Sequence, residues 1–282
     1  MTAHDYHLVC PNSGANWFRH GPRLADVDRL TSWRYLLSRR WDQRSLAHSL
    51  LKLSQHVWHY RAHRRTSVLD LVLCTSRSLQ ALLSRGGIPT VHLQNPNPAV
   101  SPLPVHRPGR LTLVFAGRIE PTKGLASFLA CLPADFAGDL VVLGEGGDRA
   151  NCENICRERG LASRVSFLGR RSREDTIAQL AAGHVAVIPS LSLETYPLVG
   201  QEALAVGTNV LVSDHGGMRE LVLDAGIGYR FRPNDPQSVT KQVREIEAAH
   251  ATGTLNAFDA QPFLATRTED AFLDGLQRAY RP

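Results

Sequence analysis

An apolar run followed at once by a polar turn occupies residues 111–124, which read Leu111-Thr112-Leu113-Val114-Phe115-Ala116-Gly117-Arg118-Ile119-Glu120-Pro121-Thr122-Lys123-Gly124. A strand that is buried on both faces reads as a continuous apolar run, without polar alternation. The run at 111–116 therefore predicts a buried strand, and helical sequence follows from Gly124. Together they predict one strand–turn–helix unit of a parallel sheet.

The same unit recurs along residues 110–250. Further apolar runs lie at 140–143, 165–168, 185–188 and 209–212, with a weaker run at 229–231. Helical stretches are expected at 174–182, 201–206 and 236–249. Strands that alternate with helices in this way predict an α/β fold with a doubly wound parallel sheet. In such sheets ligands bind at the carboxyl ends of the strands, so the turns after the strands are where a site is expected.

The first hundred residues are less regular. The sequence predicts a strong strand at 68–74, a helix at 78–85 and a short strand at 91–93, with a further strand within 2–9. Because a complete doubly wound unit has about six strands, three strands predict an abbreviated domain. Asn95-Pro96-Asn97-Pro98 is expected to be a linker. The last stretch, 260–280, reads as a helix.

Charge is distributed unevenly along the chain. Residues 1–100 contain 13 Lys and Arg against 5 Asp and no Glu, whereas the remainder carries 19 basic and 21 acidic residues. The excess suggests an anionic partner for the first part, such as anionic lipid headgroups, a phosphorylated acceptor or nucleic acid. A solvated basic surface is the alternative.

A basic helix predicted at 44–65 belongs to this part. Its apolar stripe, Leu46, Leu50, Leu53 and Val57, is expected to face the core. Association with a membrane surface, through Trp58, Arg61, Arg64 and Arg65, is the alternative. The spacing of His56, His59 and His63 predicts a polar face opposite the leucines in preference to a metal site.

Processing and compartment signals are absent from the sequence. No run approaches the roughly 18 apolar residues that a membrane-spanning helix requires, and the first residues show no secretory pattern. The expected location is the cytoplasm, with the inner face of the membrane as a further option. The five scattered cysteines predict reduced, mostly buried thiols.

Two cations mark the turn after the first run. Arg118 and Lys123 lie five residues apart where the chain enters a helix, and a helix N-terminus already favours anions. The chain has only three lysines, so a lysine in this turn favours a phosphate contact. An ordinary exposed turn is the alternative.

A second polar element follows the fourth run. It reads Glu194-Thr195-Tyr196-Pro197-Leu198-Val199-Gly200-Gln201-Glu202. Pro197 suits a first helical turn, which would leave the amides of Leu198, Val199 and Gly200 free to face an anion. Carboxylates such as Glu194 and Glu202 accept hydrogen bonds from sugar and ribose hydroxyls.

In combination these elements resemble the retaining glycosyltransferases of family 4, which have the two-domain GT-B architecture. The likeness extends through Gly144-Glu145-Gly146, Val165-Ser166-Phe167-Leu168-Gly169, Ala205-Val206-Gly207 and Gly216-Gly217-Met218-Arg219-Glu220, and covers residues 66–250. A dinucleotide-binding interpretation of the segment at 144–147 is rejected, because the G-x-G-x-x-G spacing is missing.

The resemblance implies a role for each residue. Arg118 and Lys123, beside Gly117, would bind the donor diphosphate, and Glu202 would hold the ribose. Glu194 would contact the donor sugar. The base would lie near Gly169 and Arg170, and Tyr196, Pro197, Leu198 and Val199 would meet the phosphate or sugar. His4 would stand beside the donor sugar.

The resemblance also implies a domain plan and a reaction. Two Rossmann-like domains are expected: a truncated acceptor-side domain over 1–98 and a donor-binding domain over 99–258, with a C-terminal helix at 259–282 that braces the first. A UDP- or GDP-sugar would donate to a glycan or lipid-linked acceptor with retention, and no nucleic acid is expected as partner. Because two side-chain cations can stabilise the leaving phosphate, neither a metal nor another cofactor is expected.

Family members usually begin with an earlier strand and Gly-rich loop that this sequence does not contain. A nucleotide-sugar-binding module without transfer activity is therefore the alternative function. A nucleotide-sugar epimerase is disfavoured by the paired glutamates.

Overall fold

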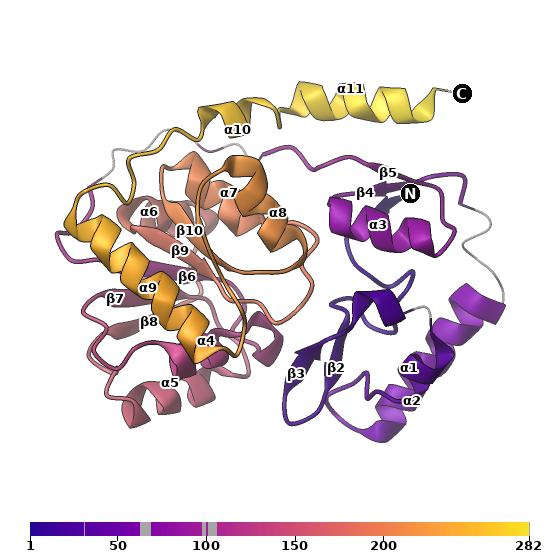
Figure 1. Cartoon of the computed structure of the whole chain (residues 1–282), viewed down its shortest axis with the longest axis horizontal. Coiled ribbons are helices and arrows are strands. Elements are labelled where there is room, and N and C mark those ends of the chain that lie inside the picture. Colours follow the sequence, from indigo (N-terminus) through magenta and orange to yellow (C-terminus); the bar gives the residue numbers. More distant parts are fainter. Residues whose placement is uncertain (31, 63–68, 98–99, 101–105, 282) are drawn as a thin grey trace.

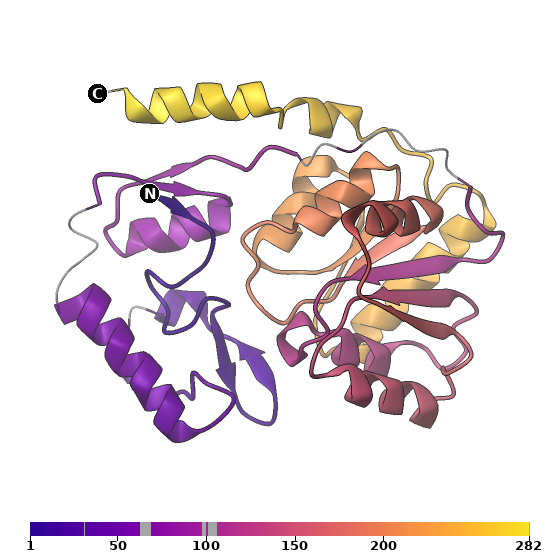
Figure 2. The ribbon, with the colours of Figure 1, turned by 180° about the vertical axis from the view of Figure 1, so that it is seen from behind.

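A computed structural model describes residues 1–30, 32–62, 69–97, 100 and 106–281. Figures 1 and 2 show two parts side by side. The larger part is built on a six-stranded sheet and the smaller part on a three-stranded sheet. They are called the six-stranded part and the three-stranded part below.

All neighbouring strands of the large sheet are parallel, in the order β11-β10-β9-β6-β7-β8. The strands are β6 (Thr112–Ala116), β7 (Asp139–Leu143), β8 (Val165–Gly169), β9 (Val185–Ile188), β10 (Asn209–Ser213) and β11 (Tyr229–Phe231). The chain moves outward from β6 to β8, returns to β9 on the other side of β6, and continues to β11. This is the order of a doubly wound sheet, with its switch point between β6 and β9. The predicted parallel α/β architecture is confirmed.

Side chains that alternate between the two faces of the sheet explain why the strands are mostly apolar. Leu113 packs in the cluster on one face of the sheet and Val114 in the cluster on the other. One face is covered by α4 (Leu125–Cys131), α5 (Arg149–Glu158) and α9 (Pro236–Ala251). The other is covered by α6 (Arg173–Ala182), α7 (Leu198–Ala205) and α8 (Gly216–Ala225). Because both faces are covered, the strand interiors are mostly apolar, as in β9, where all four residues are apolar and buried.

The small sheet is also parallel, in the order β1-β4-β5. Its strands are β1 (Thr2–Ala3), β4 (Val72–Cys74) and β5 (Thr90–His92), and α3 (Arg77–Arg85) follows β4. The strand predicted within 2–9 is thus only two residues long. The strand predicted from Val68 begins at Val72, and Val68 lies outside the described residues.

A second group of elements lies between β1 and β4. It comprises the antiparallel hairpin β2 (Asn16–Phe18) and β3 (Pro22–Leu24), then η1 (Val27–Arg29), α1 (Trp33–Leu37), α2 (Leu46–His56) and the π-helix η2 (Val57–Ala62). No periodicity in the sequence predicts the hairpin or α1. They pack around Trp41, which is completely buried.

The apolar stripe of the basic helix was expected to face the core, and this prediction is wrong for two of its four residues. Leu46 and Leu50 are exposed, whereas Leu53 and the neighbouring Ser49 and His56 are buried. Ser49 Oγ accepts a hydrogen bond of 2.6 Å from the Trp41 amide, which fixes the inward face of α2. The predicted polar histidine face is wrong as well, since His56 is buried; the positions 63–65 lie outside the described residues.

The C-terminal segment forms two helices where one was predicted. α10 (Gln261–Ala265) and α11 (Glu269–Tyr280) are separated by residues 266–268. α11 runs alongside the three-stranded part (Figures 1 and 2), and Ala279 and Tyr280 line a cavity with Met1 and Leu71. No residue of α11 is fully buried.

Candidate active site

The two polar motifs follow β6 and β9, the strands on either side of the switch point. The first contains the 3-10 turn η4 (Pro121–Lys123) and ends at Gly124. The second is tied to it by a hydrogen bond of 2.8 Å from the Leu191 amide to the Thr122 carbonyl. Gly124 has φ of +74°, and a Cβ there would lie 2.0 Å from the Pro189 carbonyl oxygen. Only glycine permits this close approach of the two motifs.

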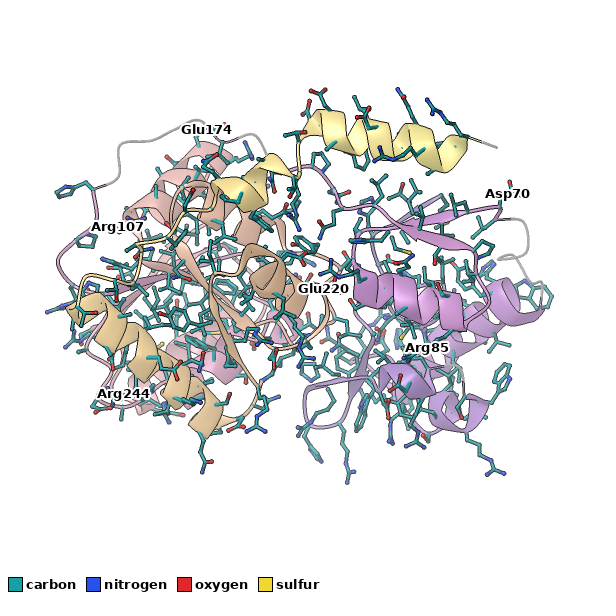
Figure 3. The ribbon with its side chains drawn as sticks, turned by 45° about the horizontal axis from the view of Figure 1, so that its top comes forward. Asp70, Arg85, Arg107, Glu174, Glu220 and Arg244 are labelled. Atoms are coloured by element: carbon teal, nitrogen blue, oxygen red, sulfur yellow. The ribbon has the colours of Figure 1, made fainter. Side chains whose placement is uncertain are left out.

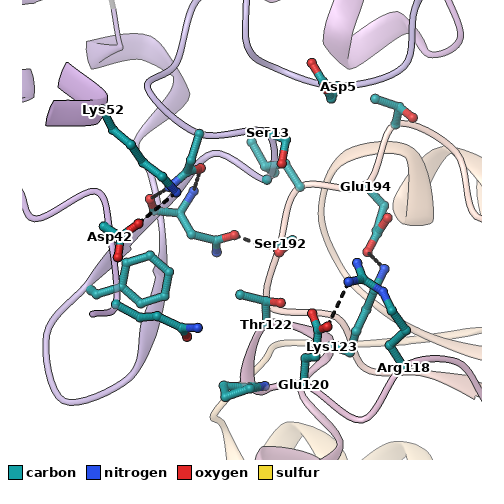
Figure 4. A pocket seen from close by; sticks show the side chains of 18 of the residues that line it. Asp5, Ser13, Asp42, Lys52, Arg118, Glu120, Thr122, Lys123, Ser192 and Glu194 are labelled. Carbon is teal, nitrogen blue, oxygen red and sulfur yellow. Dashed lines mark hydrogen bonds and ion pairs between the residues drawn. The ribbon is translucent and has the colours of Figure 1, made fainter. Parts of the chain in front are cut away.

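A cleft of about 510 Å³ opens between the two parts at this point (Figure 4), within the usual range for small-molecule sites. The six-stranded part lines it with Arg118, Glu120, Lys123 and Glu194. The three-stranded part contributes His4, Asp5, Asn12, Asn16, Phe18, Asp42, Arg44 and Lys52, among others. The structure therefore brings Arg118, Lys123, Glu194 and His4 into one cleft.

Each cation of the turn is held by a carboxylate. Lys123 Nζ donates to Glu194 Oε1 at 2.7 Å, and Ser190 Oγ donates to the same oxygen at 2.8 Å. Arg118 Nη1 donates to Glu120 Oε1 at 2.8 Å and is largely exposed to the cleft. Two cations that line one cavity can bind a polyanionic group such as a diphosphate.

The start of α7 supplies further donors. Pro197 is its N-cap, and the amides of Leu198 and Val199 have no acceptor among the residues that the structure describes. The Gly200 amide, expected to be free, instead donates to the Pro197 carbonyl at 3.1 Å. Two amides at a helix N-terminus remain available for an anion.

Glu202 projects from α7 outside this cleft. Its carboxylate lies 3.3 Å from Arg173 Nη2, and burial raises its pKa. Gly169 closes β8 with φ of +74°, and its carbonyl accepts from the Gly144 amide at 2.9 Å. Gly117, Gly169 and Arg170 lie at the carboxyl edge of the same sheet but do not line the cleft.

The side chain of Tyr196 points away from the cleft. Its hydroxyl donates to Asp224 Oδ2 at 3.2 Å, and burial raises the pKa of the phenol. Asp224 also accepts from Arg77, Gln94 and Arg267. Since Arg77 and Gln94 belong to the other part of the chain, Asp224 joins the two parts.

Glu220 makes a second connection next to Asp224. Its carboxylate accepts hydrogen bonds from the amides of Arg77 and Ser78, at 2.8 and 2.7 Å, and so caps the N-terminus of α3. Figure 3 shows Glu220 at the junction of the two parts. A carboxylate of one part thus satisfies the helix-end donors of the other.

Asn16 was missed by sequence reasoning. It is buried and donates to the Leu191 carbonyl, while Ser192 Oγ donates to its side-chain oxygen at 2.7 Å. Nearby, the Leu193 amide donates to the Gly14 carbonyl at 2.9 Å. These contacts hold the loop before Glu194 against the three-stranded part. No spacing or run in the sequence signals such a residue.

Within the described residues, no group of three His, Cys, Asp or Glu is placed to hold a metal ion. The sequence contains one Asp-x-Asp pattern, at Asp26 and Asp28, and both lie outside the cleft. Asp26 caps η1, and Asp28 pairs with Arg85. The prediction of buried, unpaired thiols is confirmed for all five cysteines.

Residues 104–253 match the sequence family described as glycosyl transferases group 1. The chain belongs to this family. The match covers more than half of its length and includes both motifs of the cleft, so the group 1 assignment and the predicted resemblance agree.

Curated relatives in sequence are also glycosyltransferases. The chain is 33% identical over 138 residues to an uncharacterized glycosyltransferase of Methanocaldococcus jannaschii, covering 48% of this chain and 35% of the relative. It is 32% identical over 188 residues to the D-inositol 3-phosphate glycosyltransferase of Mycolicibacterium vanbaalenii, covering 59% and 40%. The chain thus matches well under half of the length of these relatives.

Solved structures of GT-B glycosyltransferases share the fold. Sucrose-phosphate synthase of Thermosynechococcus elongatus aligns with a TM-score of 0.67 at 21% identity, covering 90% of this chain and 64% of that one. The HepE protein of Anabaena, solved with UDP and glucose, aligns with a TM-score of 0.63 at 20% identity, covering 84% and 69%. The group 1 chain is therefore an α/β protein of the GT-B kind across most of its described length.

The helices described here include none with both the length and the apolar character needed to cross a bilayer.

Proposed function

We propose that the chain transfers a sugar from a UDP- or GDP-sugar to a glycan or lipid-linked acceptor, with retention of configuration. The donor would lie along the carboxyl edge of the six-stranded sheet. The acceptor would enter the cleft from the three-stranded part. On this proposal residues 99–258 form the donor domain, residues 1–98 the acceptor domain, and residues 259–282 the brace between them.

The observation that carries the proposal is the pair formed by Lys123 and Glu194 at the switch point. A cation for phosphate and a carboxylate for sugar hydroxyls lie 2.7 Å apart, in a cleft shared by the two parts. In a nucleotide sugar the diphosphate is bonded directly to the hydroxylated sugar ring, so the two groups are neighbours, like the cation and the carboxylate of the cleft. The free amides of Leu198 and Val199 at the start of α7 support the same placement.

Breaking the bond between sugar and diphosphate builds negative charge on the leaving phosphate. Arg118 and Lys123 line the cleft and would stabilise this charge once the diphosphate displaces their carboxylate partners. On binding, the diphosphate takes Lys123 from Glu194, and Glu194 then accepts from the sugar hydroxyls. With these cations the reaction requires no metal.

Glu202 would hold the ribose. Its carboxylate is paired with Arg173 in the ligand-free chain, so ribose hydroxyls must displace that guanidinium. Gly169 and Arg170, at the end of β8, would flank the base, with Gly117 beside the phosphates. His4 would stand by the sugar from the opposite wall. Pro197 would fix the start of α7, and Tyr196 would act through its contact with Asp224.

A module that binds the nucleotide sugar without transferring it is the alternative, because the two cations of the cleft would hold a diphosphate in either case. The two candidates predict the same donor contacts and differ in turnover.

Calorimetric titration with UDP and GDP, followed by assays of hydrolysis and transfer from their sugars, separates these candidates. Lys123→Ala should weaken nucleotide binding and lower turnover by about 100-fold. Lys241→Ala, which removes an exposed lysine on α9, is the matched control and should change neither. Binding without turnover supports the module. Absence of both binding and turnover contradicts both candidates.

A further inference from the structure

Large apolar side chains are exposed unusually often on α1, α2 and η2. Eleven are exposed in the described part of the chain, and six of these fall within residues 33–58, fewer than a tenth of the sequence. The six are Trp33, Leu37, Leu46, Leu50, Leu51 and Trp58, named here the outer helical face. Single exposed apolar residues need no explanation, but a concentration of this kind marks a contact surface.

The core beneath these helices fixes which sides face outward. Trp41 is completely buried between them: its Nε1 donates to the Leu36 carbonyl at 2.7 Å, and its amide donates to Ser49 Oγ at 2.6 Å. Ser49 and Leu53 are therefore turned inward. Leu46, Leu50 and Leu51 remain 68%, 64% and 55% exposed. Figures 1 and 2 both show α2 on the outer flank, away from the six-stranded part.

Basic residues outnumber acidic ones around this face, although Arg44 and Lys52 both pair with Asp42. No Asp or Glu occurs between Asp42 and Asp70, whereas Arg44 and Lys52 lie in that interval and Arg61, Arg64 and Arg65 follow in the sequence. Arg34 is exposed on α1 beside Trp33. Exposed leucines, exposed tryptophans on α1 and η2, and an excess of basic charge suit helices that lie in the interface of an anionic bilayer.

We propose that the outer helical face docks on an anionic lipid surface. The same helix reaches the cleft, because Lys52 of α2 lines it together with Arg44. A headgroup held in the bilayer beside α2 would thus lie next to the cleft entrance. This last step rests on the proposed function and selects the lipid-linked acceptor from its two acceptor classes.

The docking is tested by sedimentation of the full chain with phosphatidylcholine vesicles, with and without phosphatidylglycerol. The chain should bind only the vesicles that contain phosphatidylglycerol, and high salt should release it. Leu50→Gln/Leu51→Gln should lower the partition coefficient about tenfold or more, since two exposed leucines no longer enter the interface. The matched control is Leu223→Gln, which changes an exposed leucine on α8.

Nucleotide binding by the double variant is measured in parallel, because neither leucine lines the cleft. Unchanged nucleotide binding together with lost vesicle binding supports the docking. Vesicle binding that is absent, or equal in the double variant and the wild type, overturns it. Size-exclusion chromatography tests whether the face binds a second copy of the chain. A wild-type dimer that is lost in the double variant would show this and would also overturn the proposal. None of these results depends on transfer activity.

Discussion

The two walls of the cleft are built by different means. On the six-stranded side, Arg118, Lys123 and Glu194 follow directly after strands, so the sheet itself places them at one edge. On the three-stranded side, Asn16 belongs to the hairpin and Asp42 to the connection between α1 and α2. Asn12 ties these segments together, because its side-chain amide donates to the carbonyls of Asn16 and Trp41. Chemistry at a sheet edge follows from strand order, whereas the opposite wall depends on loop contacts.

The largest effect is expected on the six-stranded wall. Glu194→Gln should lower the rate of sugar transfer about 100-fold, because the amide is a weaker acceptor for sugar hydroxyls than the carboxylate. Affinity for UDP alone should stay equal or rise, because Lys123 loses its competing partner. Transfer rates and calorimetric titration give the two values. Glu174→Gln, at an exposed position on α6, is the control.

Loss of UDP affinity in Glu194→Gln would mean that Glu194 organises the phosphate site. The distinction between a phosphate-binding lysine and a sugar-binding glutamate would then be wrong.

A second substitution tests the connection between the two parts. Asp224→Ala leaves Arg267 partly buried without its carboxylate and should lower the free energy of unfolding by about 3 kcal/mol. The three-stranded part should separate from its neighbour first, because Arg77 and Gln94 lose their partner. Chemical denaturation followed by tryptophan fluorescence reports this, since all four tryptophans lie in residues 1–60. Asp270→Ala on α11 is the control, and an equal loss of stability there would contradict a special role for Asp224.

The loop contacts between the walls should have a smaller effect. Asn16→Ala removes hydrogen bonds to Leu191 and Ser192 and should cost about 1–2 kcal/mol of stability. Because the loop before Glu194 is then held less firmly, KM for the donor should rise more than kcat falls. Steady-state kinetics separate the two. Asn151→Ala, at an exposed site on α5, is the matched change, and a KM unaffected by Asn16→Ala would show that the loop needs no support from the opposite wall.

The wall on the six-stranded side could be predicted from the sequence, whereas the wall on the three-stranded side could not. The runs of the large sheet are recognisable because burial on both faces makes them mostly apolar, and the turns that follow them predict the positions of Arg118, Lys123 and Glu194. Asn16 carries no such signal, because its partners lie about 175 residues away along the chain.

The orientation of α2 shows the same limit. Its leucine spacing predicted a core-facing stripe, but the contact of Ser49 with the Trp41 amide turned Leu46 and Leu50 outward. Periodicity identified the helix, and a single tertiary hydrogen bond decided its inward face.

The smallest effect concerns pH and compares one titratable group from each part. Burial, with His250 and Arg107 nearby, lowers the pKa of His184 in the six-stranded part to about 4. In the three-stranded part the Arg44 guanidinium holds the pKa of Asp42 well below its usual range, against the opposing effect of burial. As pH falls from about 6.5 to 4, an unfolded chain protonates His184 and the folded chain does not, so stability declines in this window. Asp42 stays ionised throughout, and its contribution is lost only at lower pH.

Melting temperatures across this pH window should therefore fall with acid in the wild type. In His184→Asn the asparagine side-chain oxygen can still accept a hydrogen bond from the Thr112 amide. The melting temperature of this variant should therefore fall less steeply with decreasing pH. Asp42→Asn should lower stability while keeping the wild-type slope. A slope that Asp42→Asn flattens and His184→Asn leaves unchanged would place the acid-sensitive contacts in the three-stranded part. In that case the loop-built wall, and not the sheet, would set the lower pH limit of the fold.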